Sequence, residues 1–243
     1  GHEFSVSNIH IMKKLAYCLF PKYYQKTLLS RVDLPPSLRH YLLKPLVDKK
    51  TLIKDIEFLV LDFETTGLNP AKEKIISMGY TVIKDLHLLA ASSQHLLINP
   101  ERSLTEENVS IHQLTDDDLS QGVSLNDAME QLFSQMENRV MIVHFDNIER
   151  RFINCACQKL YKINCLPMAM LDTLKIETKK IIRTKGYIQS ESLRLFSLRE
   201  KYNLPRYKAH NAMQDAISTA ELFLAQVSHM GDSHSIELKD LMS

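Results

Sequence analysis

Short apolar runs alternate with amphipathic segments along most of the chain. Five runs predict strands. Three of them are short and almost wholly apolar, as in strands buried on both faces, and the other two adjoin at a tight turn at Lys84 and Asp85. Apolar positions that recur every three or four residues predict helices in six other segments. The strands are residues 57–62, 75–83, 86–98, 140–143 and 168–171, and the helices are residues 7–30, 37–47, 105–113, 124–138, 148–161 and 209–228.

The order of these elements indicates the fold class. A hairpin comes first, and later strands alternate with helices, so we expect an α/β fold with a mixed five-stranded sheet flanked by helices. Near residue 55 the residue pattern changes from a basic helical one to an apolar run typical of a buried strand. We therefore expect a basic helical N-terminal extension over residues 1–54, a main domain over 55–230 and a C-terminal tail over 231–243; residues 1–4 resemble a tag scar.

Composition narrows the class of protein. Of the 243 residues, 44% are hydrophobic and 24% are charged, which excludes a disordered chain, a collagen-like repeat and a disulfide miniprotein. No apolar run approaches the roughly 20 residues that span a bilayer. Cys18, Cys155, Cys157 and Cys165 form no CxxC pair. We therefore expect a cytoplasmic protein with reduced thiols and no membrane partner.

Charge is distributed unevenly. Residues 1–54 contain ten Lys and Arg and three Asp and Glu, a net charge of +7, whereas the remainder carries −6. A basic extension on an acidic body is suited to nucleic acid, to an acidic protein partner or to the body itself. A solvated helical face is the alternative.

Two carboxylates lie at the end of the first predicted strand. Asp62 and Glu64 are two residues apart, so both side chains point to the same face. Crowded acids repel one another, and burial raises their pKa values unless a cation neutralises them. Such oxygen ligands suit Mg²⁺ or Mn²⁺. An isolated pair of this kind is more often solvated, so the interpretation depends on what accompanies it.

Four further patterns follow in a fixed order. In full, the series is Asp62-Phe-Glu-Thr-Thr-Gly-Leu68, Asn99-Pro100, Glu107-x4-His112, His144-x4-Glu149-x2-Phe152 and His210-x4-Asp215. Over residues 57–227 the chain resembles the DEDDh family of 3′→5′ exonucleases, which includes the proofreading (epsilon) subunit of bacterial DNA polymerase III. The resemblance implies a ribonuclease H-like fold and two divalent metal ions, Mg²⁺ or Mn²⁺.

The resemblance also implies roles for single residues. Asp62 matches the ligand that bridges both ions, Glu64 a ligand of one ion that reaches towards the terminal nucleotide, and Asp215 a further ligand. His210 matches the general base, which takes the proton of the attacking water. The residues that match substrate contacts are Thr65, Thr66 and Gly67 in the nucleotide pocket, and Glu107 and His112 at the 3′-terminal nucleoside.

One motif departs from the family. The motif that begins at His144 normally reads His-Asn-x-x-Phe-Asp in this family. Here the position of its final Asp falls on Glu149, whose side chain is one methylene longer. We expect Glu149 to be the fourth ligand. Asp146 is the competing candidate, although it lies only two residues after His144.

The expected function is metal-dependent hydrolysis of single-stranded or frayed DNA from its 3′ end, which releases nucleoside 5′-monophosphates. Two alternatives stay open. One is a small-RNA 3′→5′ exoribonuclease of the same family. The other is a catalytically weak adaptor, altered in its second motif, that binds partners through residues 5–54.

Overall fold

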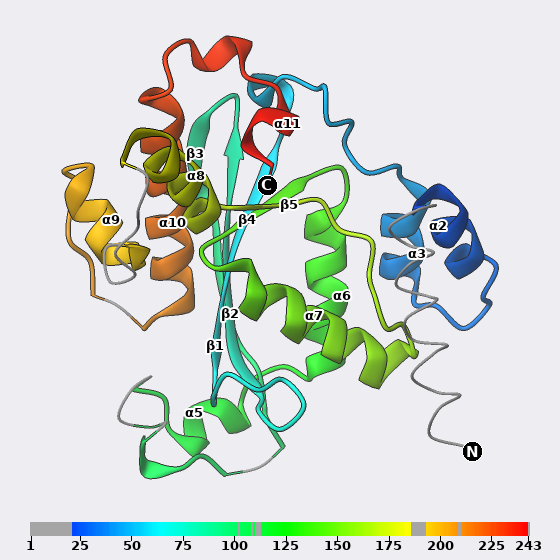
Figure 1. The fold of residues 1–243 in the computed structure, drawn as a ribbon. Coiled ribbons are helices and arrows are strands. Elements are labelled where there is room, and N and C mark those ends of the chain that lie inside the picture. The colour runs from blue at the N-terminus through cyan, green and yellow to red at the C-terminus, as the bar shows by residue number, and fades with distance from the viewer. Residues whose placement is uncertain are drawn as a thin grey trace, which may run out of the picture.

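The computed structural model describes residues 21–101, 103–107, 109, 113–185, 193–208 and 210–242. Its centre is a five-stranded sheet in the order β3-β2-β1-β4-β5 (Figure 1). β1 is antiparallel to β2 and parallel to β4, β2 is antiparallel to β3, and β4 is parallel to β5, so the predicted mixed sheet is confirmed. The strands are β1 Phe58–Thr65, β2 Ile75–Lys84, β3 His87–Leu97, β4 Val140–Val143 and β5 Met170–Asp172.

The predicted hairpin turn lies one residue later than expected. Asp85 and Leu86 occupy it with φ of 50° and 57°, the left-handed conformation that matches the twist of two antiparallel strands. The described helices are α2 Pro21–Leu29, α3 Pro36–Leu43, α5 Asp116–Ser120, α6 Leu125–Met136, α7 Asp146–Tyr161, α8 Thr173–Lys185, α9 Leu195–Lys201, α10 Ala212–Ser228 and α11 Leu238–Leu241.

Most predicted helices are present, with shifted ends. Ser124 caps α6, α7 begins two residues before the predicted start, and α9 was not predicted. Residues 7–20 of the first predicted helix and part of 105–113 lie outside the described residues. The described Cys155, Cys157 and Cys165 are free thiols.

Alternate residues of β1 pack into two separate cores. Leu59 and Leu61 face the side covered by α6, α7 and α3. Phe58 and Val60 face the side covered by α8, α10 and α11. Because side chains alternate along a strand, Asp62 and Glu64 continue the second row. The two acids therefore point towards α10.

The N-terminal extension packs against the body in its described part. Leu28, Leu38 and Leu42 are buried in the core that α6 helps to form. Tyr24 donates a hydrogen bond to the carbonyl of Cys165 at 2.9 Å. The apolar side of the extension thus faces the body, whereas lysines such as Lys26 are exposed. A protein partner on these basic helices stays a prediction, as does the domain boundary near residue 55.

The segment predicted as a C-terminal tail folds back onto the start of the main domain. Leu238 and Leu241 are buried, and the amide of Leu238 donates to the carbonyl of Thr51 at 2.9 Å. The amide of Ile53 donates to Ile236 at 2.9 Å. These two leucines share one side of the short helix α11, which completes the core beside α10. The predicted division of the chain into domain and tail stays a prediction.

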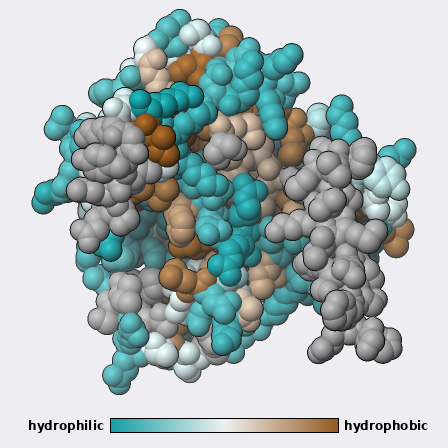
Figure 2. Space-filling model, in the orientation of Figure 1, coloured by the Kyte–Doolittle hydropathy of each residue, from teal (hydrophilic) through white to brown (hydrophobic). Residues whose placement is uncertain are grey.

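No helix in the described part of the chain is long and apolar enough to cross a bilayer. The face drawn in Figure 2 is mostly hydrophilic and is interrupted by small hydrophobic areas.

Candidate active site

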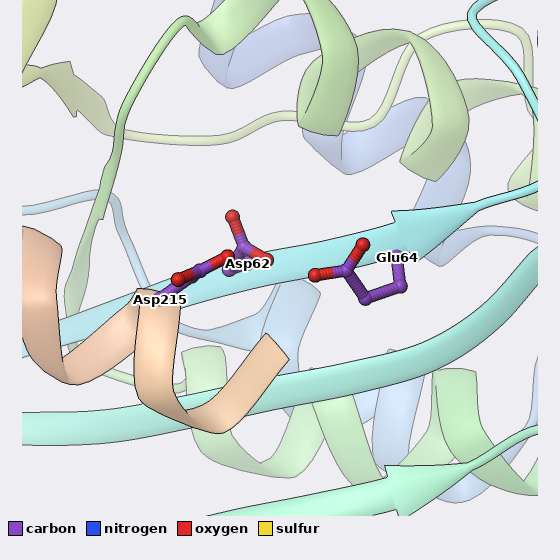
Figure 3. A group of neighbouring side chains, drawn as sticks. All are labelled: Asp62, Glu64 and Asp215. Atoms are coloured by element: carbon purple, nitrogen blue, oxygen red, sulfur yellow. The ribbon is translucent and has the colours of Figure 1, made fainter. Parts of the chain in front are cut away.

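Three carboxylates from two elements converge beside the sheet. Asp62 and Glu64 project from the end of β1, and Asp215 projects from the first turn of α10 (Figure 3). One carboxylate oxygen of each lies within 4.8 Å of the others. Glu64 and Asp215 are buried, whereas Asp62 is partly exposed.

A glycine explains how α10 reaches these acids. Gly79 of β2 pairs with Asp62 across the sheet. A Cβ atom on Gly79 would lie 2.0 Å from the carbonyl carbon of Ala212, so only glycine admits the first turn of α10 at this distance. Ala212 and Ala216 are fully buried against the sheet. The small-residue contact therefore places Asp215 beside Asp62.

A fourth acid adjoins the three. Glu149 lies in the first turn of α7, is 3% exposed and accepts a hydrogen bond from the backbone N–H of Phe63. Its negative charge acts on Asp62. We call Asp62, Glu64, Glu149 and Asp215 the acidic cluster.

Burial and mutual repulsion shift the titration of the cluster. Burial, followed by the charges of the other three acids, raises the pKa of Asp62 well above its usual range. Burial also raises the pKa of Glu149 to about 8, against the backbone N–H groups that stabilise its charge. Burial and the charge of Glu64 raise the pKa of Asp215 to about 7. The cluster therefore favours protons or another positive charge at neutral pH.

Two oxygens of the cluster fit a cation. Glu149 Oε2 and Asp215 Oδ1 are buried and have no hydrogen-bond partner among the described residues. A buried acceptor without a donor is costly unless something else satisfies it. Carboxylate oxygens suit hard ions such as Mg²⁺ or Mn²⁺. The donor set thus fits the metal that the sequence predicts.

Asp146, the competing candidate, has different partners. Its Oδ2 accepts a hydrogen bond from Lys175 Nζ at 2.8 Å and lies 3.6 Å from Arg150 Nη2. Two cations therefore already neutralise this carboxylate, in contrast to Glu149 on the same helix.

His210 lies in the bend before α10. Its backbone N–H donates to Asp215 Oδ2 at 3.1 Å, and its φ is 68°, an uncommon value for a residue other than glycine. Asn211, the next residue, caps α10 through the amide of Gln214 at 3.1 Å. His210 itself is exposed. The backbone at this bend thus orients the acid while leaving the imidazole open to solvent.

The turn after β1 is closed by its own side chains. Thr65 Oγ1 donates to the carbonyl of Gly67 at 2.9 Å. Thr66 Oγ1 donates to Glu73 and accepts from the amide of Lys74. A Cβ atom on Gly67 would lie 2.9 Å from Cγ of Glu73, so a larger residue would displace that side chain. These contacts fix the shape of the turn next to Glu64.

Two predicted substrate contacts lie on the segment that follows β3. Glu107 is exposed. His112 lies outside the described residues.

Two residues near the cluster organise its helices. Asp172 accepts from the amides of Phe145 and Leu174 through Oδ1 and from the amide of Asp146 through Oδ2, at 2.8–2.9 Å. Asp172 therefore caps α8 and also holds the start of α7. The ring of His144 lies 2.7 Å from Thr173 Oγ1 and 2.9 Å from the carbonyl of Leu193, and burial lowers its pKa.

Sequence reasoning missed a buried arginine. Arg199 of α9 donates to Glu221 Oε2 and to the carbonyl of Ser218, both on α10 and both at 2.7 Å. Its guanidinium also lies 4.8 Å from the ring centre of Tyr207. The sequence carries no signal for this network, because its members are separated along the chain and follow no motif.

Comparison with known proteins identifies the family. The family model described as "Exonuclease" matches residues 59–223. A PolC-type DNA polymerase III of Thermotoga petrophila is 30% identical over 173 residues, which are 71% of this chain and 12% of that protein. The 3′-5′ exonuclease DinG of Staphylococcus haemolyticus is 28% identical over 167 residues, 69% of this chain and 18% of that protein. The chain thus spans under a fifth of these relatives' length.

Solved structures agree on the fold. Cell-death related nuclease 4 superposes with a TM-score of 0.61 at 20% identity, over 72% of this chain and 64% of that one. The nuclease domain of 3′hExo, a DEDDh family member bound to rAMP, gives 0.58 at 16% identity, over 74% and 94%. The predicted resemblance to DEDDh exonucleases is confirmed, and the chain belongs to the exonuclease family.

Proposed function

We propose that this protein is a metal-dependent 3′→5′ exonuclease that releases nucleoside 5′-monophosphates from single-stranded or frayed DNA. One observation carries the proposal. The acidic cluster gathers four carboxylates from β1, α7 and α10, and two of their buried oxygens have no donor among the described residues. Membership of the exonuclease family supplies the reaction class.

The four acids would hold two divalent ions, Mg²⁺ or Mn²⁺. Such ions activate an attacking water and stabilise the leaving 3′ oxygen of a phosphodiester. Asp62 interacts with the other three acids, which supports the position shared by both ions. The burial of Glu149 beside Asp62 supports it as the fourth ligand, and the pairing of Asp146 with Lys175 argues against the alternative.

His210 would act as the general base. An imidazole with an ordinary pKa near 6.5 accepts a proton at neutral pH. The hydrogen bond from its backbone N–H to Asp215 keeps the residue next to the cluster, and its exposure leaves the ring able to reach an incoming water. We place Thr65, Thr66, Gly67, Glu107 and His112 at the terminal nucleotide, on the family pattern alone.

DNA is the proposed substrate because the relatives named above include a DNA polymerase III. A small-RNA substrate is the nearest alternative, and an adaptor without activity is the rival from another class. Asp62, Glu64, His210 and Asp215 all match the family pattern, which argues against the adaptor.

The test is digestion of 3′-labelled and 5′-labelled single-stranded DNA with Mn²⁺, Mg²⁺ or EDTA, beside a matched RNA strand and the His210→Ala variant. We expect stepwise loss from the 3′ end of DNA, abolished by EDTA and reduced at least about 100-fold in the variant. Faster digestion of the RNA strand than of the DNA strand would identify RNA as the preferred substrate. No cleavage by folded protein with either ion would favour the adaptor.

A further inference from the structure

Basic side chains line one exposed face of α8. Lys175, Lys179 and Arg183 lie four residues apart, so they follow one another along the same side of the helix. Glu177, the one acid of this helix, is fully buried and accepts hydrogen bonds from Lys201 and Tyr202. The exposed face of α8 therefore carries positive charge without an acid of its own.

A shallow hollow accompanies these cations. It has a volume of about 340 Å³ and is lined by the three basic residues with Thr178 and Ile182. Ile182 is 53% exposed, and Figure 2 shows a hydrophobic spot bordered by hydrophilic side chains over α8. Lys180 points elsewhere, because its Nζ donates to the hydroxyl of Tyr202 at 3.0 Å. We call Lys175, Lys179, Ile182 and Arg183 the α8 stripe.

The α8 stripe begins close to the acidic cluster. Asp172 caps the starts of both α7 and α8, so these two helices diverge from one point. Lys175 contacts Asp146, which lies three residues before Glu149 on α7. In Figure 1, α8 extends from the end of β5 alongside α10. A strand leaving the cluster along α8 would meet the three cations in succession.

We propose that the α8 stripe binds the phosphodiester backbone of the single strand whose 3′ end occupies the acidic cluster. Charge complementarity identifies the occupant, because a polyanion supplies one phosphate for each cation. Four residues of α-helix rise about 6 Å, a distance comparable with the separation of neighbouring phosphates on an extended strand. Ile182 offers an apolar contact for a sugar or a base between them.

The existing partners of the cations leave room for this role. Lys175 shares Asp146 with Arg150, so two positive charges face one negative charge there. Lys179 Nζ contacts only the carbonyls of Asp240 and Met242, at 3.3 Å, among the described residues. Neutral carbonyls leave its charge uncompensated. The inference rests on the proposed function for the direction of the strand, but the surface can be tested without hydrolysis.

The experiment measures binding by fluorescence anisotropy in EDTA, with a labelled single strand of about 20 nucleotides, longer than one such site. The test variant combines Lys175→Gln, Lys179→Gln and Arg183→Gln. The control removes the same charge elsewhere, by Lys84→Gln, Lys159→Gln and Lys162→Gln, three exposed lysines at the end of β2 and at the far end of α7. Circular dichroism and thermal unfolding check that both variants are folded.

We expect the Kd of the test variant to rise at least 10-fold at about 50 mM salt. The slope of log K against log salt should fall by about 2, since each single-strand contact contributes about 0.7. The control should change Kd less than 3-fold. Equal losses in both variants, or no loss in the folded test variant, would overturn the inference.

Hydrolysis separates this inference from the proposed function. If the strand binds through α8 but Mn²⁺ produces no cleavage, the exonuclease proposal fails and the binding surface stands. If Mn²⁺ produces cleavage but the test variant binds as the control does, the proposal for the α8 stripe is wrong and the proposal of an exonuclease is retained.

Discussion

Buried charged side chains lie on two sides of α10. On one side they are paired with opposite charges, and on the other they lie among charges of the same sign. On one side, Arg199 is 1% exposed and pairs with Glu221, while Tyr207 bonds the same carboxylate and lies under the guanidinium. On the other side, the acidic cluster brings acids together, and the described structure supplies no cation that pairs with Asp62 or Glu149. The first arrangement pairs its charges within the chain, although Arg199 Nε has no acceptor among the described residues. The second requires a positive charge from outside.

This difference separates stability from function. Removing one partner of a buried pair leaves an uncompensated charge and destabilises the fold. Removing one of several acids that repel one another relieves repulsion instead. The Arg199 network should therefore matter for folding, and the acidic cluster for chemistry. The following predictions test that division.

Asp62→Asn should have the largest effect on activity. Asp62 interacts with all the other acids, so its loss should lower kcat/KM on 5′-labelled single-stranded DNA by about 10³-fold, equivalent to about 4 kcal/mol. The free energy of unfolding in EDTA should stay within about 1 kcal/mol of wild type or increase. A folded variant that keeps its activity would remove Asp62 from the proposed ligands.

Arg199→Met should have the opposite profile. It breaks the buried pair with Glu221, so urea denaturation in EDTA should show a loss of about 3 kcal/mol in the free energy of unfolding. Arg206→Met is the matched control, because Arg206 is 81% exposed in its pair with Glu200 and should cost less than about 0.5 kcal/mol. Equal losses of unfolding free energy in the two variants would show that the buried Arg199 network stabilises the fold no more than a surface ion pair does.

A second pair of variants applies the same reasoning within one helix. Glu149→Gln should lower kcat/KM about 100-fold, or about 2.7 kcal/mol, because the charges that act on its buried carboxylate come from acids, Asp172 and Asp146, and not from a cation. Asp146→Asn should lower it less than about 10-fold, since Lys175 and Arg150 already neutralise this acid. The reverse order of effects would assign the fourth ligand to Asp146.

The sequence predicts those parts of the molecule that depend on local pattern. Alternation along β1 places Asp62 and Glu64 on one face, and the spacing of small residues places Ala212 and Ala216 on one side of α10. The mixed character of the sheet follows from the succession of hairpin and helical crossovers. Each of these features is written into a few consecutive residues, so a periodic pattern is enough to detect it.

Features that depend on distant partners were not predictable. Gly79 matters only because Ala212 approaches it from another part of the chain, and Arg199 is buried only because Glu221 and Tyr207 meet it. Helix α9 is short, and Arg194 at its start provides no side-chain cap, so no local signal marks it. The return of residues 236–241 likewise depends on main-chain bonds to residues 49–53, which any sequence can make.

The smallest predicted effect concerns pH: the degree to which a divalent ion stabilises the folded protein should depend on it. The pKa of Glu149 is raised to about 8 and that of Asp215 to about 7, both above the ordinary values of 4.5 and 3.8. The folded protein therefore holds more protons than the unfolded chain, so its metal-free stability should fall as pH rises from about 5 to about 8. A divalent ion must displace these protons, and its binding should strengthen over the same range. The increase in Tm caused by Mn²⁺ should accordingly be larger at pH 8 than at pH 6. Mn²⁺ at 100 times its Kd stabilises the folded state by about 2.7 kcal/mol. Differential scanning fluorimetry at the two pH values measures it, and Asp62→Asn should weaken the increase at both. The same increase at pH 6 and pH 8 would show that the acids are already ionised without metal, and the contrast with the Arg199 network would then lose its electrostatic basis.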